Sequence, residues 1–262
     1  MGQDASRAPY GVLVLHGLTS SLASVMPVAD RLAVHGIPCS VPWLRGHGTR
    51  PEDLVGVTWR DWYTDAAAAL DQLLARCDEA AVVGLSMGGL LALHLALERP
   101  ARLRGVVAIA PALRQAHPLA ALVPLVAPFC RFLPVPRRGF SDPSRASRAQ
   151  GYRRLPTTAF LSLLAYARWL EPRLGAVRTP TLIIHSRADR VIHPASATRI
   201  YARLGSTEKE LRWFERSGHE MLLDCEAEAV LDVVEQFLLA RRPGRKGGAL
   251  TTALERAEAA ET

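Results

Sequence analysis

Short apolar runs alternate along most of the chain with longer segments whose apolar residues recur every three or four positions. The short runs are typical of buried strands, and the longer spacing is typical of amphipathic helices. We predict strands at residues 10–17, 37–42, 80–85, 103–111, 179–186 and 210–215. Helices are predicted from Ser20 or Ser21 to near Gly36, and at 58–77, 87–98, 194–204 and 224–241. This alternation predicts an α/β fold with a mostly parallel central sheet flanked by helices.

The alternation breaks between residues 112 and 174, where prolines and arginines are frequent and no segment has a convincing strand pattern. The clearest helix of this segment is predicted at 156–170. Insertions that follow the carboxyl end of a parallel strand tend to lie over the crevice where ligands bind. We therefore predict an α/β core formed by residues 1–111 and 175–240, a helical cap insertion at 112–174 and a loose C-terminal tail at 241–262.

Composition narrows the class of protein. The 262 residues are 49% hydrophobic and 22% charged, which suits one large domain with a sizeable core. The four cysteines form no CxxC pair, so we expect a reducing cytoplasm rather than a disulfide framework or a zinc site. No secretory signal is visible at the N-terminus, and the longest apolar stretch, 117–136, contains Arg131 and five prolines, which excludes an uninterrupted membrane-spanning helix.

Positive charge is concentrated in one part of the chain. The formal net charge is +7, and residues 112–178 carry eleven arginines against Asp142 and Glu171, so this segment alone has a balance of +9. A basic face attracts nucleic acid, anionic lipid or acidic proteins. Because the segment contains no recognisable nucleic-acid module, we expect no nucleic-acid partner. The positive charge of this segment then indicates either a solvated, arginine-rich surface or a weak contact of the basic, apolar cap with a membrane surface.

The stretch VVGLSMGG (82–89) sets Ser86 between Gly84 and Gly88, where a predicted strand meets a predicted helix. The pattern G-x-S-x-G is common by chance, but this context is that of a sharp turn that exposes a nucleophilic serine above a sheet. Strand and helix approach closely there, so glycine is needed on both sides. We predict that Ser86 is a nucleophile.

A nucleophilic serine needs a base, and the base needs a carboxylate that orients it. His219 follows the strand at 210–215 in a loop before the last helix, and it is the best placed of the eight histidines; His16 and His47, in glycine turns, are interpreted as structural. Asp189 follows the strand at 179–186. The rival acid is Asp224, for which capping of the last helix is a sufficient role, and Asp142 in the insertion is a weaker candidate.

The remaining part is a site for a developing oxyanion. His16 and Gly17 turn the chain after the first strand and leave the Leu18 N–H free to point into the crevice. The Met87 N–H, at the start of the helix after Ser86, is the second expected donor.

Together these segments resemble the α/β-hydrolase superfamily, and within it the small bacterial carboxylesterases and monoacylglycerol lipases. The matching stretches are VLVLHGLTSS, the RGHG loop, VVGLSMGG, SRADRVIHP and WFERSGHEMLLD, in the right order from about residue 10 to 240. The resemblance implies an α/β-hydrolase fold, the triad Ser86, Asp189 and His219, oxyanion donors at Leu18 and Met87, and a cap over the acyl pocket.

The function expected is hydrolysis of short-to-medium acyl esters or monoacylglycerols through an acyl-enzyme, with no cofactor and no metal. A small-molecule ester is the expected partner, and the oligomeric state is left open. One alternative is a thioesterase, amidase or carbon–carbon bond hydrolase that uses the same triad, since fold does not decide among these activities. Another is a non-catalytic binding protein that keeps the pocket.

Overall fold

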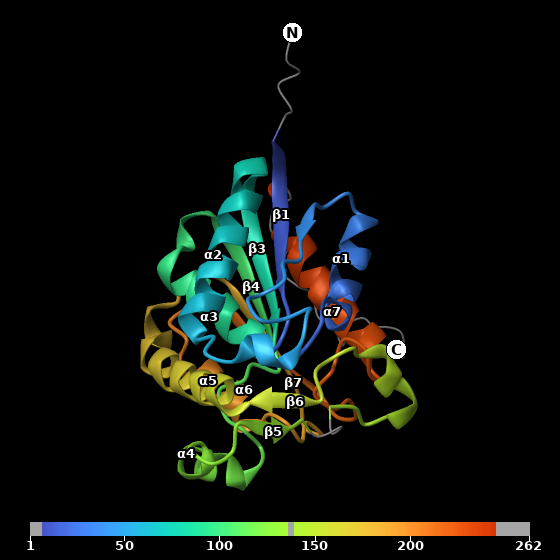
Figure 1. Cartoon of the computed structure of the whole chain (residues 1–262). Coiled ribbons are helices and arrows are strands. Elements are labelled where there is room, and N and C mark those ends of the chain that lie inside the picture. Colours follow the sequence, from blue (N-terminus) through green and yellow to red (C-terminus); the bar gives the residue numbers. More distant parts are fainter. Residues whose placement is uncertain (1–6, 136–138, 245–262) are drawn as a thin grey trace.

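A six-stranded parallel sheet forms the centre of the computed structural model, which describes residues 7–135 and 139–244 (Figure 1). Its strands, in spatial order, are β2 (Cys39–Ser40), β1 (Ala8–Leu15), β3 (Cys77–Leu85), β4 (Leu103–Ile109), β7 (Thr181–Ser186) and β8 (Lys209–Phe214). Every neighbouring pair is parallel. The α/β class and the six strands predicted are therefore confirmed. β2 is shorter than expected, because Pro38 and Pro42 beside it lack the N–H that a longer ladder needs.

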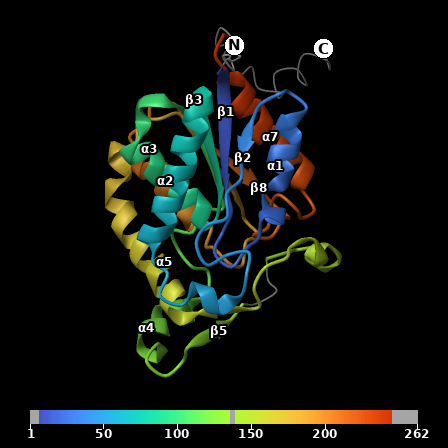
Figure 2. The same cartoon turned by 45° about the horizontal axis from the view of Figure 1, so that its top comes forward.

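Helices cover both faces of the sheet (Figures 1 and 2). One face is covered by α1 (Met26–Ala33) and α7 (Ala227–Ala240), and the other by α2 (Trp59–Arg76), α3 (Met87–Glu98) and α6 (Ala195–Arg203). Each face of the sheet has its own hydrophobic core, and strand β1 contributes side chains to both, because successive side chains of a strand point to opposite faces. Leu13 and Leu15 are buried on the side of α2 and α3, and Val12 and Val14 on the side of α1 and α7.

Residues 112–174 leave the sheet after β4, and their short elements lie beyond the carboxyl ends of the strands (Figure 1). The helix expected at 156–170 is confirmed as α5 (Thr157–Leu170), and a short helix, α4 (Val123–Val126), precedes it. The expectation that this segment has no strand is wrong. β5 (Phe132–Pro134) and β6 (Arg154–Pro156) pair as an antiparallel ribbon, and strands of three residues are too short to leave an alternating pattern in the sequence.

The insertion is partly fused to the core rather than laid over it. Ala159, Leu163, Tyr166 and Leu170 of α5 are buried in the same cluster as side chains of α2 and α3. The α4 end, by contrast, protrudes from the molecule (Figure 1). Within the described ranges, no helix combines the length and apolar character needed to cross a membrane. Most of the predicted tail, residues 245–262, lies outside the described residues.

Candidate active site

Ser86 occupies a sharp turn between β3 and α3. Its backbone has φ 58° and ψ −115°, an unusual conformation for a residue with a side chain, which costs on the order of 1–3 kcal/mol. Two hydrogen bonds tie the turn to the segment at the end of β4: the Ser86 N–H donates to the Ile109 carbonyl at 2.9 Å, and the Ser86 carbonyl accepts from the Ala112 N–H at 3.2 Å. Ser86 is partly exposed at the carboxyl edge of the sheet.

The two flanking glycines are required by close backbone contacts. A Cβ at Gly84 would lie 2.0 Å from the Gly88 carbonyl oxygen, and a Cβ at Gly88 would lie 2.2 Å from the Leu15 carbonyl oxygen. Neither space admits a methyl group. The G-x-S-x-G spacing thus packs the start of α3 directly against the end of β1, where the loop with Leu18 begins.

Asp189 and His219 form a buried pair at the same edge of the sheet. His219 Nδ1 lies 2.8 Å from Asp189 Oδ2, and the two residues are 6% and 5% exposed. The other carboxylate oxygen, Oδ1, accepts from the Val191 and Ile192 N–H groups at 2.8 and 2.9 Å. These backbone donors fix the Asp189 carboxylate, so that His219 Nδ1 carries the shared proton and Nε2 is left as a base.

The electrostatics of this pair follow from its burial and its charges. Burial alone would lower the pKa of His219, but the Asp189 carboxylate outweighs it and raises that pKa above the ordinary histidine value. Burial would likewise raise the pKa of Asp189, but the imidazoles of His219 and His185 hold it well below its ordinary value. Asp189 is therefore ionised at neutral pH, and His219 is a stronger base than a histidine in water.

His185 is a neighbour that sequence reasoning interpreted only as a core residue. It is fully buried, as expected, but its Nε2 lies 3.4 Å from Asp189 Oδ2 and 3.3 Å from the Ile192 carbonyl. In the sequence, only its position four residues before Asp189 could have indicated that His185 lies beside that carboxylate. Asp189 is thus flanked by two imidazoles, and His185 adds a second polar contact to the oxygen that faces His219.

No hydrogen bond in residues 7–135 and 139–244 joins Ser86 Oγ to another side chain. Such contacts are often long in the free enzyme and tighten when substrate binds. The expected oxyanion donors flank the same serine. Gly17 packs so closely on Ser86 that a Cβ there would be 3.1 Å from the Ser86 Cβ. Leu18 follows it, Met87 begins α3, and neither N–H donates to a described residue.

The assignment of Asp224 as a helix N-cap is wrong. α7 begins at Ala227 and its N-cap is Glu226, so Asp224 precedes the helix. The fully buried Asp224 carboxylate instead accepts from three backbone N–H groups, those of Gly218 at 2.6 Å, Ser141 at 2.7 Å and Asp142 at 3.1 Å. It therefore ties the loop that carries His219 to the insertion. Asp142, the weaker candidate for the acid, donates its backbone N–H to Asp224, and its own carboxylate bonds Ser144 and Arg145.

The raised pKa of His219 leads to a prediction on pH. Under the roles predicted from the sequence, Ser86 as nucleophile and His219 as base, we expect kcat/KM for a soluble ester to rise with pH along one titration, because only a neutral imidazole accepts a proton. Its midpoint should lie above the ordinary histidine pKa of about 6.5, since kcat/KM reports the free enzyme. The measurement is kcat/KM across the neutral range at constant ionic strength. A midpoint below the ordinary value would contradict the pairing of His219 with an ionised Asp189.

Among the described residues, no group of three or more histidine, cysteine, aspartate or glutamate side chains has the arrangement of a metal site. The expectation that no metal and no cofactor takes part stays a prediction. Activity that is lost in a chelator and restored by a divalent ion would contradict it.

Comparison with known proteins adds independent information. A family model described as serine aminopeptidase, S33, matches residues 8–226. The chain is 32% identical over 233 residues to a thermostable monoacylglycerol lipase of Bacillus sp. (strain H-257), which covers 89% of this chain and 92% of that one. It is 28% identical over 231 residues to a carboxylesterase of Bacillus subtilis (strain 168), covering 87% and 91%. The solved structure of a metagenome-derived lipolytic enzyme superposes with a TM-score of 0.84 at 35% identity, over 90% of this chain and 95% of that one.

Proposed function

Since the chain belongs to the serine aminopeptidase S33 family of α/β hydrolases, and is a serine ester hydrolase like its lipase and esterase relatives, we propose that Ser86, His219 and Asp189 are its catalytic triad. The observation that carries the proposal is the buried Asp189–His219 pair at 2.8 Å, at the sheet edge where Ser86 is partly exposed on its strained turn. The substrate is a small-molecule ester.

The reaction follows from these positions. Ser86 Oγ attacks the ester carbonyl carbon while His219 Nε2 takes its proton, and the carbonyl oxygen becomes an oxyanion that accepts from the Leu18 and Met87 N–H groups. His219 then gives the proton to the leaving alkoxide as the C–O bond breaks, which forms the acyl-enzyme. Water, deprotonated by His219, then attacks the acyl carbon. The bond between that carbon and Ser86 Oγ breaks, His219 returns the proton to Oγ, and the acid is released. Each oxyanion donor contributes about 3 kcal/mol in the transition state.

We propose acyl groups of short to medium length, including monoacylglycerols, as the preferred substrates. In this proposal the insertion is a cap, and its half-buried apolar side chains are the candidates for the lining of the acyl pocket: Phe132, Leu133, Phe160 and Leu161. Each buried CH₂ adds about 0.8 kcal/mol of affinity. A closed cap limits the length that fits and excludes the bulk of triacylglycerols.

A panel of esters tests this specificity. We expect kcat/KM to climb from acetyl to medium-chain esters and then level off or fall, with poor activity on emulsified triolein. Matched thioesters and amides of the best acyl group belong in the same panel, because they separate an esterase from a thioesterase or amidase with the same triad. Rates that are highest for acetyl esters and decline steadily with length would contradict the acyl pocket.

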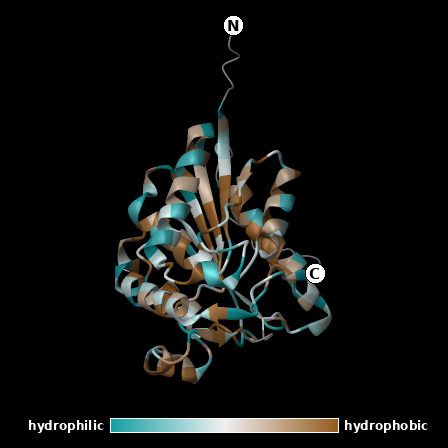
Figure 3. Cartoon of the chain, in the orientation of Figure 1, coloured by the Kyte–Doolittle hydropathy of each residue, from teal (hydrophilic) through white to brown (hydrophobic). Residues whose placement is uncertain are grey.

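The outer surface of the insertion supports a contact with lipid. Five apolar side chains around α4, here called the α4 patch, are 44–91% exposed: Leu119, Leu122, Leu125, Val126 and Phe129. Figure 3 shows the apolar colouring of this protruding end. Arg131 is exposed next to the patch, so its charge favours anionic headgroups. We propose that the α4 patch makes a weak contact with the lipid surface that presents the substrate.

Removal of apolar area tests the α4 patch. We expect the double variant Leu125→Ser/Phe129→Ser to lose most of its co-sedimentation with phosphatidylglycerol-containing vesicles, while kcat/KM on a soluble ester is unchanged. Val34→Ser is the matched control, because Val34 is 83% exposed on α1's C-cap, away from the insertion. Equal vesicle binding by the double variant and the native protein would overturn the lipid contact.

A further inference from the structure

Two buried histidines join the loop after β1 to the loop after β2, because each accepts a hydrogen bond from a backbone N–H of the other's loop. His47 Nε2 accepts from the Thr19 N–H at 3.1 Å, and His16 Nε2 accepts from the Leu44 N–H at 3.2 Å. Their rings are in edge contact, with centroids 4.7 Å apart, and they are 5% and 0% exposed. The two loops are therefore joined in both directions by side chains that sequence reasoning interpreted as merely structural.

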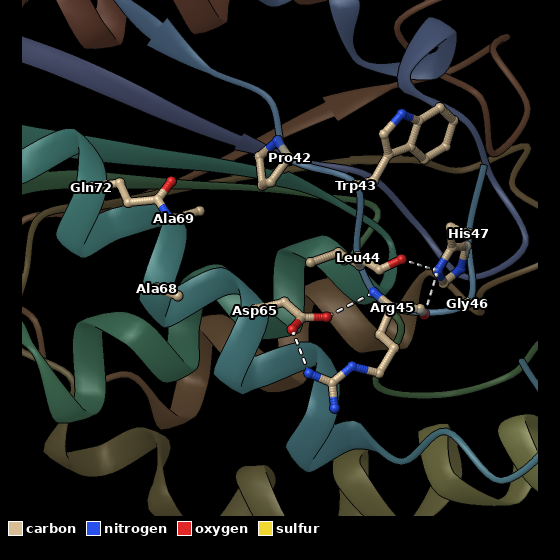
Figure 4. Close-up of a pocket in the computed structure, with 10 residues that line it drawn as sticks. All are labelled: Pro42, Trp43, Leu44, Arg45, Gly46, His47, Asp65, Ala68, Ala69 and Gln72. Atoms are coloured by element: carbon tan, nitrogen blue, oxygen red, sulfur yellow. Dashed lines mark hydrogen bonds and ion pairs between the residues drawn. The ribbon is translucent and has the colours of Figure 1, made fainter. Parts of the chain in front are cut away.

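The hydrogen bonds of His47 fix which of its nitrogens carries the proton. Nδ1 lies 3.1 Å from the Leu44 carbonyl and 3.2 Å from the Arg45 carbonyl, so Nδ1 is the donor and Nε2 is an acceptor (Figure 4). Burial, together with the neighbouring His16, lowers the pKa of His47 to about 3. The ring is thus neutral at physiological pH and keeps its lone pair toward Thr19.

The bond from His47 acts on the residue next to an expected oxyanion donor. Thr19 has φ 62°, which a residue with a branched side chain rarely adopts, so its conformation must be held by its surroundings. It is held on both sides: its N–H by His47 and its carbonyl by the Tyr152 N–H at 2.8 Å. The bonded N–H belongs to the Leu18–Thr19 peptide, whereas the Leu18 N–H belongs to the peptide before it. Because only the φ and ψ torsions of Leu18 separate these two peptides, fixing the second limits the directions in which the Leu18 N–H can point.

Tyr152 brings the insertion into contact with the same two loops. Its ring stacks on His47 with an interplanar angle of 5°, and its hydroxyl donates to the Gly46 carbonyl and accepts from the Thr49 N–H, each at 3.0 Å. Tyr152 belongs to the insertion, whereas His47 belongs to the loop after β2. The strained loop beside Ser86 is therefore clamped between the two.

We propose that His47 is a positioning residue, which holds the Leu18 N–H in the orientation that stabilises the oxyanion. It does not touch the substrate; it acts through the Leu18–Thr19 peptide. The proposal rests on the proposed function, because it assigns His47 a role only if the oxyanion hole is used. Its effect belongs in the transition state rather than in binding of the ester, since the donor is aimed at charge that develops during attack.

Three variants test this. His47→Phe keeps an aromatic ring against Tyr152 but removes the acceptor, and His47→Gln keeps an acceptor. His94→Leu is the matched control, because His94 is also buried (1% exposed) and hydrogen-bonded, to the Tyr166 hydroxyl at 3.0 Å, but lies two turns along α3 from Ser86. We expect His47→Phe to lower kcat by about 10- to 100-fold with little change in KM, and to weaken a trifluoromethyl ketone inhibitor by the same factor. His47→Gln should recover most of both losses, and His94→Leu should keep its kcat.

The outcomes separate the two proposals. Native kcat in a folded His47→Phe, or a fall in kcat with no matching loss of inhibitor affinity, overturns the role of His47 and leaves the triad in place. An equal fall in His94→Leu overturns it too, since the effect would then be one of general destabilisation. Should His47→Phe not fold, His47→Met replaces it, because a thioether is a poor acceptor. If the native protein hydrolyses no ester, the proposed function itself fails.

Discussion

Ser86→Ala is expected to abolish ester hydrolysis while the protein keeps its fold. The change removes one partly exposed hydroxyl, and the Cβ that already tolerates φ 58° stays in place, so the strain of the turn is unchanged. Without Oγ no acyl-enzyme forms. In a well-studied serine hydrolase, loss of the nucleophile costs on the order of a million-fold in kcat. The measurement is kcat on the best ester of the panel, with thermal unfolding followed by circular dichroism.

The control is a serine that the structure keeps away from the reaction. Ser144 is exposed on the insertion, and among the described residues its side chain bonds only Asp142, so Ser144→Ala should retain full activity. A fluorophosphonate probe should label the native protein and Ser144→Ala in a one-to-one ratio, and leave Ser86→Ala unlabelled. Turnover by Ser86→Ala at a rate near that of the native protein would refute Ser86 as nucleophile.

The parallel sheet and the residues at its edge could be predicted because each depends on a local pattern. A buried parallel strand is a short apolar run, and VVGLSMGG combines such a run with the two glycines that the contact between β3, α3 and β1 requires. Asp189 and His219 could be chosen by their places after strands, because the carboxyl ends of parallel strands meet at one edge. The pairing of these two side chains at 2.8 Å follows from that topology.

What the sequence left open depends on contacts between distant residues. The three-residue strands β5 and β6 are defined by their pairing with each other, which places Phe132 opposite Pro156 and Leu133 opposite Leu155. Asp224 has the residue type of a helix cap, but its oxygens are taken by N–H groups of the insertion that no local pattern identifies. Likewise His47 and Thr19 are separated by 28 residues, and their bond is set by how two loops pack.

The second large loss of activity is expected when the carboxylate that bonds His219 is replaced. Asp189→Asn is expected to lower kcat by about 10⁴-fold, as the equivalent change does in a well-studied serine protease, because an amide cannot stabilise the imidazolium and favours the wrong tautomer of His219. The backbone donors to Oδ1, Val191 and Ile192, can still bond an amide oxygen, so the fold should survive. The residual activity should also titrate at lower pH than in the native protein, because Asp189 is what raises the pKa of His219 against the effect of burial.

Asp224→Asn should instead lower the stability of the fold more than the activity. Its two carboxylate oxygens accept from three N–H groups, and an amide offers one oxygen while its NH₂ meets a donor, so about 1–3 kcal/mol of stability should be lost. The His219–Asp189 pair stays intact, so kcat should fall less than tenfold and its pH profile should keep its midpoint. Both variants are compared by kcat, pH profile and Tm, with Asp71→Asn as the control, because Asp71 is exposed and its carboxylate bonds the Arg99 guanidinium at the surface. A larger loss of kcat in Asp224→Asn than in Asp189→Asn, with a displaced pH midpoint, would transfer the role of the acid to Asp224.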